Sequence, residues 1–261
     1  LGLPLAKALL VKGFSVNGST TSQEKLSILQ NAGINPFLIQ LDSKSVSGSI
    51  ETFLQESTIL VLDIPPKLRG NNSEDFIGKI QNLIPFIEKS SVENVLFISS
   101  TSVYGEKNDR VTEETLLNPD TEGGRQLVIV ESLLQKNKNF KTTILRFGGL
   151  IGEDRNPVKF LAGRENIENP DAPINLIHQE DCIGIILKII EEESWNETFN
   201  AVSPFHPSRE QYYTQKALEL NLAVPKFSHE KPSFGKTIES TKVEKIVKYT
   251  LIFSLFCSIA C

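Results

Sequence analysis

Four hydroxyl residues close an apolar run in the stretch NVLFISSTSVYG, residues 94–105. The run from Val95 to Ile98 is long enough for a buried parallel strand. It is followed by Ser99, Ser100, Thr101 and Ser102. Ligands of open α/β sheets lie outside the carboxyl ends of the strands, so these hydroxyls could hydrogen-bond a cofactor or a substrate. An ordinary polar turn is the alternative, because Ser and Thr are common turn residues.

Polar residues also follow three other strands that the sequence predicts. Hydroxyls at residues 19–22 come after a short strand at 14–18. Asp42 follows a strand at 36–41, and Asp63 follows one at 58–62. Pro65 and Pro66 lack amide donors and so prevent further pairing beyond that point. We therefore expect these polar residues to lie at strand ends.

Helices and strands alternate along the first half of the chain. Helices are expected at residues 5–11, 23–32, 50–55 and 73–89, between the strands at 14–18, 36–41, 58–62 and 95–98. This alternation is typical of a parallel sheet with right-handed crossovers. The fold class is therefore α/β.

The second half is less regular. A helix is expected at 121–138, a strand at 142–147, and a glycine-rich exit, FGGLIG, at 147–152. The segment 156–173 is rich in Asn, Pro and charge and is interpreted as a loop over a cleft, before INLIH and a helix at 181–192. We expect one nucleotide-binding domain at 1–155 to which 174–192 returns. Residues 156–173 and 193–261 would form the substrate-side loop and a small carboxyl-terminal lobe.

Composition favours small-molecule partners. The 261 residues are 39% hydrophobic and 23% charged, as in an ordinary globular protein, and the net charge of -5 provides no basic surface for nucleic acid or an anionic membrane. The three cysteines, Cys182, Cys257 and Cys261, form neither a metal-ligand set nor a convincing disulfide framework. This usage suits a reducing, cytoplasmic location, with no metal and no membrane partner.

Both ends of the sequence are unusual. The chain contains no methionine and begins directly with LGLPLAKALL, a helical pattern that nothing precedes, so we expect a leading segment to be missing. The last residues, 249–261, read YTLIFSLFCSIAC, an apolar run shorter than the roughly 20 residues that span a bilayer. A buried strand or an aberrant terminus is favoured over a membrane anchor.

Several of these motifs, taken in order, resemble one superfamily. They are the spacing of Gly2, Gly13, Val16 and Gly18, the ISSTSVYG stretch, the LRFGGLIG exit and INLIHQED. Together they resemble extended short-chain dehydrogenases/reductases, and more closely the atypical NAD(P)-dependent epimerase/dehydratase-like proteins, up to about Tyr249. The resemblance implies a Rossmann-like doubly wound parallel sheet with a small carboxyl-terminal substrate lobe. On this pattern the first strand would precede Leu1 and is expected to be missing.

The resemblance also implies a dinucleotide site. Gly2 matches the last glycine of the glycine-rich turn between the first strand and the first helix of a Rossmann fold. This turn places the pyrophosphate at the helix amino terminus. Asp42 matches the position that contacts adenine, and Asp63, Ile64 and Pro65 match the segment beside the cofactor ribose. The full set of expected cofactor-binding residues is Gly2, Ser19, Thr20, Thr21, Asp42, Asp63, Ile64, Pro65 and Ser99.

In this superfamily, the residues at the end of the second strand of the Rossmann fold indicate which cofactor is bound. NAD sites usually place a carboxylate there, and such a group would repel a 2′-phosphate. This chain has Ser19, Thr20, Thr21 and Ser22, with Lys25 one turn further on. NADP is therefore favoured, with NAD as the alternative. Another interpretation is that Ser22 caps a helix and Lys25 lies on its exposed face.

The acid/base pair of the superfamily is absent. Aligning its P-x-S-x-Y-x-x-x-K-x-x-x-E pattern from Pro119 places Gly123 at the Tyr position, Leu127 at the Lys position and Glu131 at the Glu position. Neither Gly123 nor Leu127 can transfer a proton. Ser100 matches the hydroxyl that orients the substrate, and Tyr104 is a candidate replacement acid. The Tyr of VYG is usually structural in this superfamily, so that alternative stays open.

Other polar residues are expected near the substrate. Ser102, Gly149 and His178 are candidate substrate contacts, although for His178 a buried, hydrogen-bonded structural role is slightly favoured. Arg125 lies out of phase with Gly123 and Leu127 on the helix, so it either binds an anion or is simply exposed.

Three functions are compatible with these features. The first is an NAD(P)-dependent oxidoreductase or epimerase that acts on a small carbonyl or sugar-type substrate with a nonstandard acid/base. The second is a noncatalytic NAD(P)-binding sensor or interaction protein, and the third is a structural relic. The expected partners are a dinucleotide and a small molecule, and a homodimer is compatible with the sequence.

Overall fold

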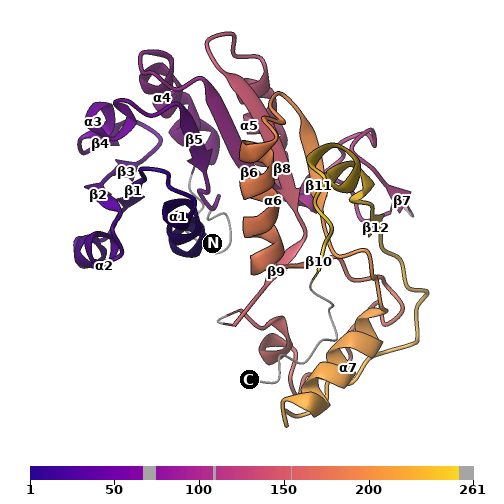
Figure 1. Cartoon of the computed structure of the whole chain (residues 1–261). Helices are drawn as coiled ribbons and strands as arrows, with labels where there is room; N and C mark the ends of the chain where they lie inside the picture. Colours follow the sequence, from indigo (N-terminus) through magenta and orange to yellow (C-terminus); the bar gives the residue numbers. More distant parts are fainter. Residues whose placement is uncertain (67–74, 108–109, 154, 253–261) are drawn as a thin grey trace. The chain divides into compact units, whose positions relative to one another are not determined.

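The computed structural model describes residues 1–66, 75–107, 110–153 and 155–252 (Figure 1). Its chain divides into two compact units. Unit 1 comprises residues 1–99, 121–145 and 186–198, and unit 2 comprises 100–120, 146–185 and 199–261. The domain boundaries expected near residues 155 and 193 remain predictions.

A four-stranded sheet with the order β11-β8-β6-β5 is the centre of the fold. Its strands are β5 (Ile59–Leu62), β6 (Asn94–Ser100), β8 (Lys141–Phe147) and β11 (Thr198–Ala201). β5 pairs with β6 in parallel, with Ile59 opposite Asn94. Val95, Leu96 and Phe97 are completely buried, as expected for a strand that is covered on both faces. The predicted α/β class with a parallel central sheet is confirmed.

Unit 1 contains two further pairs of strands. β1 (Asn17–Thr20) pairs in parallel with β2 (Asn35–Leu38), and β3 (Gln40–Leu41) pairs antiparallel with β4 (Val46–Ser47). β1 begins later than the sequence predicts. The reason is that the backbone just before it closes the preceding helix, with Phe14 N–H donating to Leu9 O and Gly13 at a φ of +87°.

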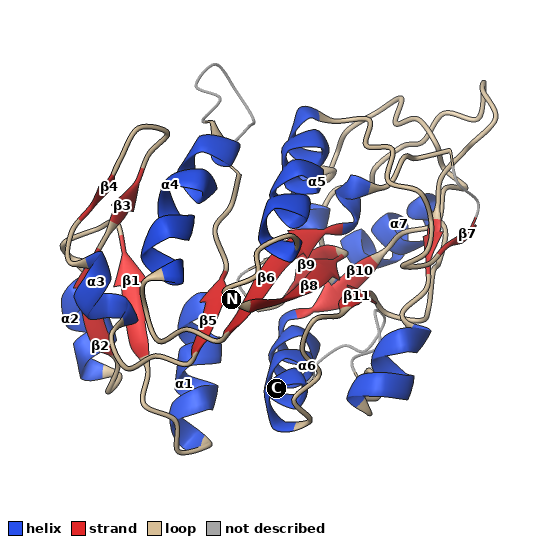
Figure 2. Ribbon diagram, turned by 90° about the horizontal axis from the view of Figure 1, so that it is seen from above, coloured by secondary structure: helices blue, strands red, loops and turns tan. Residues whose placement is uncertain are grey.

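Helices flank these strands on both sides. The structure contains α1 (Gly2–Val11), α2 (Lys25–Asn31), α3 (Ile50–Leu54), α4 (Phe76–Glu88), α5 (Glu122–Gln135) and α6 (Gln179–Glu191), the last of which crosses the boundary between units. Within unit 1, α4 and α5 lie on one face of β5 and β6, and α1 lies on the other (Figure 2). Residues 73 and 74 of the predicted fourth helix lie outside the described residues.

Polar caps explain where several helices begin. The Asp75 carboxylate accepts from Gly78 N–H at 2.9 Å before α4, and the Thr121 hydroxyl accepts from Gly124 N–H at 3.1 Å before α5. The interpretation of Ser22 as a helix cap is wrong. α2 follows Glu24, and Ser22 N–H instead donates to the Thr20 hydroxyl at 3.1 Å.

Unit 2 is built from short elements. Its remaining strands are β7 (Arg110–Val111), β9 (Gly149–Ile151), β10 (Leu176–His178) and β12 (Thr237–Ile238). β9 pairs with β10 and β7 pairs with β12, both in parallel. The predicted loop at 156–173 contains a 3-10 helix, Pro157–Phe160. This helix packs against α7 (Arg209–Glu219) through a small core of Val158, Ile174, Leu176, Tyr212 and Ala217.

The last described residues dock against the amino-terminal part of α6. The Tyr249 hydroxyl donates to the Asp181 carboxylate at 2.9 Å, and Ile252 N–H donates to the same oxygen at 3.0 Å. Most of the predicted apolar terminal run, including Cys257 and Cys261, lies outside the described residues. Across the ranges that the structure covers, no helix combines the length and apolarity needed to cross a bilayer.

Candidate cofactor site

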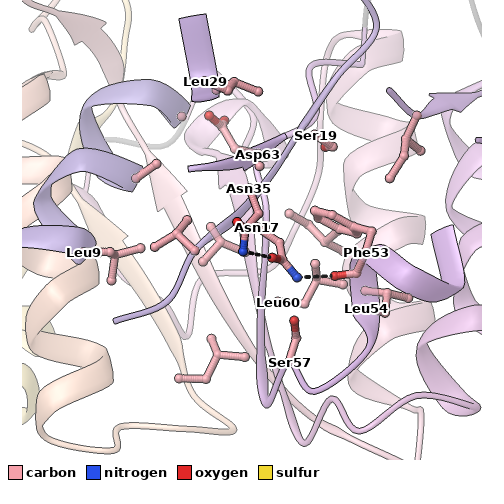
Figure 3. Close-up of a pocket in the computed structure, with 18 of the residues that line it drawn as sticks. Leu9, Asn17, Ser19, Leu29, Asn35, Phe53, Leu54, Ser57, Leu60 and Asp63 are labelled. Atoms are coloured by element: carbon pink, nitrogen blue, oxygen red, sulfur yellow. Dashed lines mark hydrogen bonds between the residues drawn. The ribbon is translucent and has the colours of Figure 1, made fainter. Parts of the chain in front are cut away.

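A cavity of about 810 Å³ opens in unit 1 between β1 and β5 (Figure 3). Its walls come from α1, α2, α3 and both strands, with single contributions from α4 and α6. Two asparagines bridge part of it, because Asn35 donates to the Asn17 side-chain oxygen at 3.1 Å and Asn17 donates to Phe53 O at 2.9 Å. The cavity therefore lies along the two strands whose polar ends the sequence singled out.

Five of the predicted cofactor residues line this cavity. They are Gly2, Ser19, Thr20, Asp63 and Ile64. Gly2 is the first residue of α1, and a Cβ added to it would lie 3.9 Å from an Asp63 carboxylate oxygen. The start of α1 and the end of β5 are thus close together. Among the described residues, no side chain hydrogen-bonds the first amides of this ten-residue helix. The first amides of a helix are groups that can bind an anion.

The charge pattern at the end of β1 fits an anionic dinucleotide. Ser19 and Thr20 supply hydroxyls, and Lys25 of α2 also lines the cavity. Two carboxylates line the cavity among the described residues, Glu56 before β5 and Asp63 after it. NAD sites usually carry a carboxylate at the end of the strand that corresponds to β1. Helix amides, hydroxyls and a lysine are together suitable donors for phosphate groups.

The other predicted cofactor residues are not among the described residues that line the cavity. They are Thr21, Asp42, Pro65 and Ser99. Asp42 organises the turn between β3 and β4, where its carboxylate accepts from Lys44 N–H at 2.7 Å and from Ser45 N–H at 2.8 Å. These two backbone bonds lower the pKa of Asp42. The cofactor roles of all four residues remain predictions.

Ser99 is buried at the end of β6 and contacts α5. Its hydroxyl donates to the Glu131 carboxylate at 2.6 Å, and both side chains are buried. Leu127, one turn earlier on α5, is only 4% exposed. Arg125 is exposed and pairs with Glu122 at 3.1 Å. Gly123 and Leu127, the α5 positions predicted to correspond to the superfamily's catalytic pair, carry no group that transfers protons. Their correspondence to that pair remains a prediction.

Ser100 begins a tight turn in unit 2. Its hydroxyl accepts from Ser102 N–H at 3.1 Å at the start of the 3-10 helix Thr101–Val103. The hydroxyls of Ser100 and Ser102 therefore belong to one turn, and both residues are half-buried. Ser100 can still donate its own proton while its oxygen accepts from Ser102.

Tyr104, two residues later, is 1% exposed and is held in a polar network. Its hydroxyl donates to the Asn200 side-chain oxygen at 2.8 Å and accepts from the Arg146 guanidinium at 2.7 Å. Arg146 also lies 5.1 Å from the centre of the tyrosine ring. Burial raises the pKa of Tyr104, and Arg146 opposes that effect. This geometry favours the structural alternative for Tyr104 over proton transfer.

Lys236 is a residue that sequence reasoning missed. Its buried ammonium donates to Thr101 O at 3.1 Å and to Tyr104 O at 2.8 Å, and it pairs with Glu106 at 2.8 Å. It therefore fixes both ends of the turn after Ser100. A lone lysine more than 130 residues further along the chain carries no local signal of this contact.

Gly149 and His178 lie on neighbouring strands of unit 2. Gly149 pairs with Leu176, and His178 pairs with Ile151. A Cβ on Gly149 would approach the end of the Leu176 side chain to 2.6 Å, so a larger residue there would require that side chain to shift. His178 Nδ1 accepts from Glu180 N–H at 3.2 Å at the start of α6. Their substrate roles remain predictions.

Several solved structures share the fold of this chain. MoeE5 in complex with UDP-glucose and NAD matches with a TM-score of 0.78 and 16% identity, covering 97% of this chain and 91% of that one. UDP-glucuronic acid 4-epimerase from Bacillus cereus in complex with NAD matches with a TM-score of 0.76 and 18% identity, covering 97% and 88%. The fold is thus that of NAD-dependent epimerases and dehydratases, which confirms the predicted resemblance at the level of fold.

A curated relative gives the family. Protein YeeZ of Escherichia coli strain K12 is 32% identical over 245 residues, which cover 93% of this chain and 89% of YeeZ. The chain therefore belongs to the YeeZ family. No protein-family model matches it. Within the described ranges, no cluster of three or more His, Cys, Asp or Glu residues could hold a metal ion.

Proposed function

We propose that this protein binds NADP, or NAD less tightly, and acts as an epimerase- or oxidoreductase-type enzyme on a small carbonyl or sugar-type substrate. The observation that carries the proposal is the unit 1 cavity, which brings Gly2, Ser19, Thr20, Asp63 and Ile64 to one place. The UDP-glucose in the MoeE5 complex and the UDP-glucuronic acid on which the Bacillus cereus epimerase acts support a sugar-type substrate.

Each group of lining residues has a proposed role in holding the dinucleotide. The amides at the start of α1, near Gly2, would hold the pyrophosphate, and Asp63 and Ile64 would lie beside the ribose. Ser19 and Thr20, with Lys25, hold the 2′-phosphate of the adenosine. The bound cofactor supplies hydride transfer. In this proposal Ser100 orients the substrate oxygen, while the proton is moved by a group outside the usual Tyr and Lys positions.

Cofactor binding is tested by following NADPH and NADH fluorescence on titration with the protein. Lys25→Glu places a negative charge beside the 2′-phosphate and is expected to weaken NADPH binding about tenfold or more, with little effect on NADH. Lys7→Glu is the matched control, because Lys7 is exposed on α1 and is not among the described lining residues. If neither nucleotide binds at millimolar concentration, the proposed function is wrong.

A noncatalytic NAD(P)-binding sensor is the second candidate. It is favoured by the predicted alignment, which puts Gly123 and Leu127 at the positions of the acid/base pair, and by the burial of Leu127. Turnover against a panel of carbonyl compounds and nucleotide sugars distinguishes the two candidates. An enzyme would lose turnover in Ser100→Ala while retaining cofactor binding, and Arg125→Ala would change neither. Cofactor binding without turnover across the panel would support the sensor.

A further inference from the structure

The turn that follows Ser100 in unit 2 is held by a lysine from a distant segment. Lys236 is only 5% exposed, and its ammonium donates to Thr101 O at 3.1 Å and to Tyr104 O at 2.8 Å. Its third contact is with the Glu106 carboxylate, at 2.8 Å. A lysine ammonium has three N–H donors and no acceptor, so these contacts use all three. Lys236 therefore has no donor left for a substrate, which argues against a direct acid/base role.

The backbone around Lys236 is itself held by neighbouring segments of unit 2. Lys236 O accepts from the Asn175 side-chain amide at 2.7 Å, and Ile238 N–H donates to the Asn175 side-chain oxygen at 2.8 Å. Lys236 also immediately precedes β12, which pairs with β7 (Figure 1). The lysine therefore reaches the turn from a fixed base. A side chain that its surroundings hold in this way can keep another group in one geometry.

The direction of the Ser100 hydroxyl depends on the shape of this turn. Its oxygen accepts from Ser102 N–H at 3.1 Å, and Tyr104 N–H donates to Thr101 O at 3.2 Å. The two residues whose carbonyl oxygens bind Lys236 thus lie on either side of Ser102. Among the described residues, no acceptor takes the proton of the Ser100 hydroxyl, so this proton can be donated to a ligand.

We propose that Lys236 is a positioning residue, which holds the Ser100 hydroxyl in the direction that the substrate oxygen requires. This role rests on the proposed function, in which Ser100 orients that oxygen. Displacing an orienting group is costly, since a misplacement of about 1 Å can lower a rate about 100-fold. Loss of the ammonium releases both carbonyl oxygens and lets the turn relax. Lys236 thus acts on kcat through Ser100, without contacting the substrate.

A double-mutant cycle tests this role with a carbonyl compound or nucleotide sugar that the protein turns over. Lys236→Met is expected to lower kcat about tenfold or more, with the Kd for NADPH changed by less than about twofold. In the Ser100→Ala background the same substitution should cause little further loss, because the group through which Lys236 acts is already gone. Losses of kcat that multiply in the double variant overturn the proposal, since a merely structural defect would lower kcat equally in both backgrounds.

Amide hydrogen exchange provides a second measurement, which requires no turnover. Ser102 N–H, which bonds to the Ser100 hydroxyl, is expected to exchange about tenfold or more faster in Lys236→Met. Lys226→Met removes an exposed lysine of the same unit and is the matched control, which should change neither kcat nor this exchange. A wild-type protein without turnover would contradict the proposed enzyme, and Lys236 would then be judged by this exchange. Unchanged exchange at Ser102 in Lys236→Met overturns the positioning role.

Discussion

Tyr104 illustrates how the surroundings of a residue decide its role. From sequence, a tyrosine after a hydroxyl-rich strand end is a candidate acid, but its hydroxyl is bonded to Asn200 and Arg146 and is removed from solvent. Proton transfer requires the hydroxyl to reach the reacting atom, whereas here it links two buried polar groups. Its contribution is therefore expected to be to stability.

Tyr104→Phe is expected to lower the free energy of unfolding by about 1–3 kcal/mol, because Arg146 and Asn200 each lose a buried partner. Urea unfolding measures this change. Tyr213→Phe, at a half-buried site on α7, is the control and should cost less. An undiminished unfolding free energy with abolished turnover would instead make Tyr104 the missing acid.

Some residues of the candidate site could be predicted individually from the sequence. Gly2 could be named because it matches a glycine position, and Ser19 and Asp63 because apolar runs predicted strands that end just before them. In the structure Ser19 lies inside β1 rather than after it. Lys236 could not be named. Its contacts with the turn after Ser100 depend on how a distant segment packs, which no local pattern encodes.

At the scale of elements, Lys236 determines the shape of the turn Thr101–Val103. Lys236→Met keeps most of the apolar stem but removes the ammonium that binds two carbonyl oxygens. The free energy of unfolding is expected to fall by about 1–3 kcal/mol, since those oxygens lose a buried charged donor. Chemical denaturation tests this value. Lys226→Met, which breaks an exposed ion pair with Glu165, should cost far less, because solvent screens exposed charges.

Two glycines in helices should respond to alanine in opposite ways. Apart from its chain neighbours and the backbone of its own helix, no described atom lies within 4 Å of a Cβ at Gly123 in α5. Gly123→Ala should therefore stabilise by up to about 1 kcal/mol through helix propensity. At Gly184 in α6, a Cβ would overlap the Tyr249 ring. Gly184→Ala should displace that ring, break its bond to Asp181 and destabilise. Melting temperatures of the two variants compare them directly, and equal shifts would contradict the expectation.

For the whole molecule, the order of helices and strands was the most predictable property. The alternation of apolar runs and amphipathic segments predicted the parallel sheet, and the structure contains it. Strand ends were less predictable. At residues 14–16 the backbone is used to end α1, where Phe14 N–H donates to Leu9 O, and β1 begins only afterwards. The cavity could not be foreseen as a shape, because it depends on elements from separate places in the chain.

The stability of the whole protein is expected to fall at alkaline pH. Burial raises the pKa of Tyr212 to about 12 and also raises that of Tyr249, whose hydroxyl donates to Asp181. The unfolded chain releases these protons near pH 10, so the folded state binds more protons between about pH 10 and 12 and loses stability as the pH rises. Urea unfolding at about pH 9 and 11 should show this decrease, with a smaller slope in Tyr212→Phe. If the unfolding free energy fell equally steeply with pH in the wild-type protein and in Tyr212→Phe, Tyr212 would not be a cause of the decrease.

The docking of Tyr249 over Gly184 has an evolutionary consequence. The ring occupies the space that any side chain at position 184 would need, and its hydroxyl satisfies the buried Asp181. Substitutions at these three positions should therefore be coupled during divergence. Homologues with a larger residue at 184 are expected to have lost the aromatic ring at 249, and those without the tyrosine hydroxyl to have replaced the carboxylate at 181.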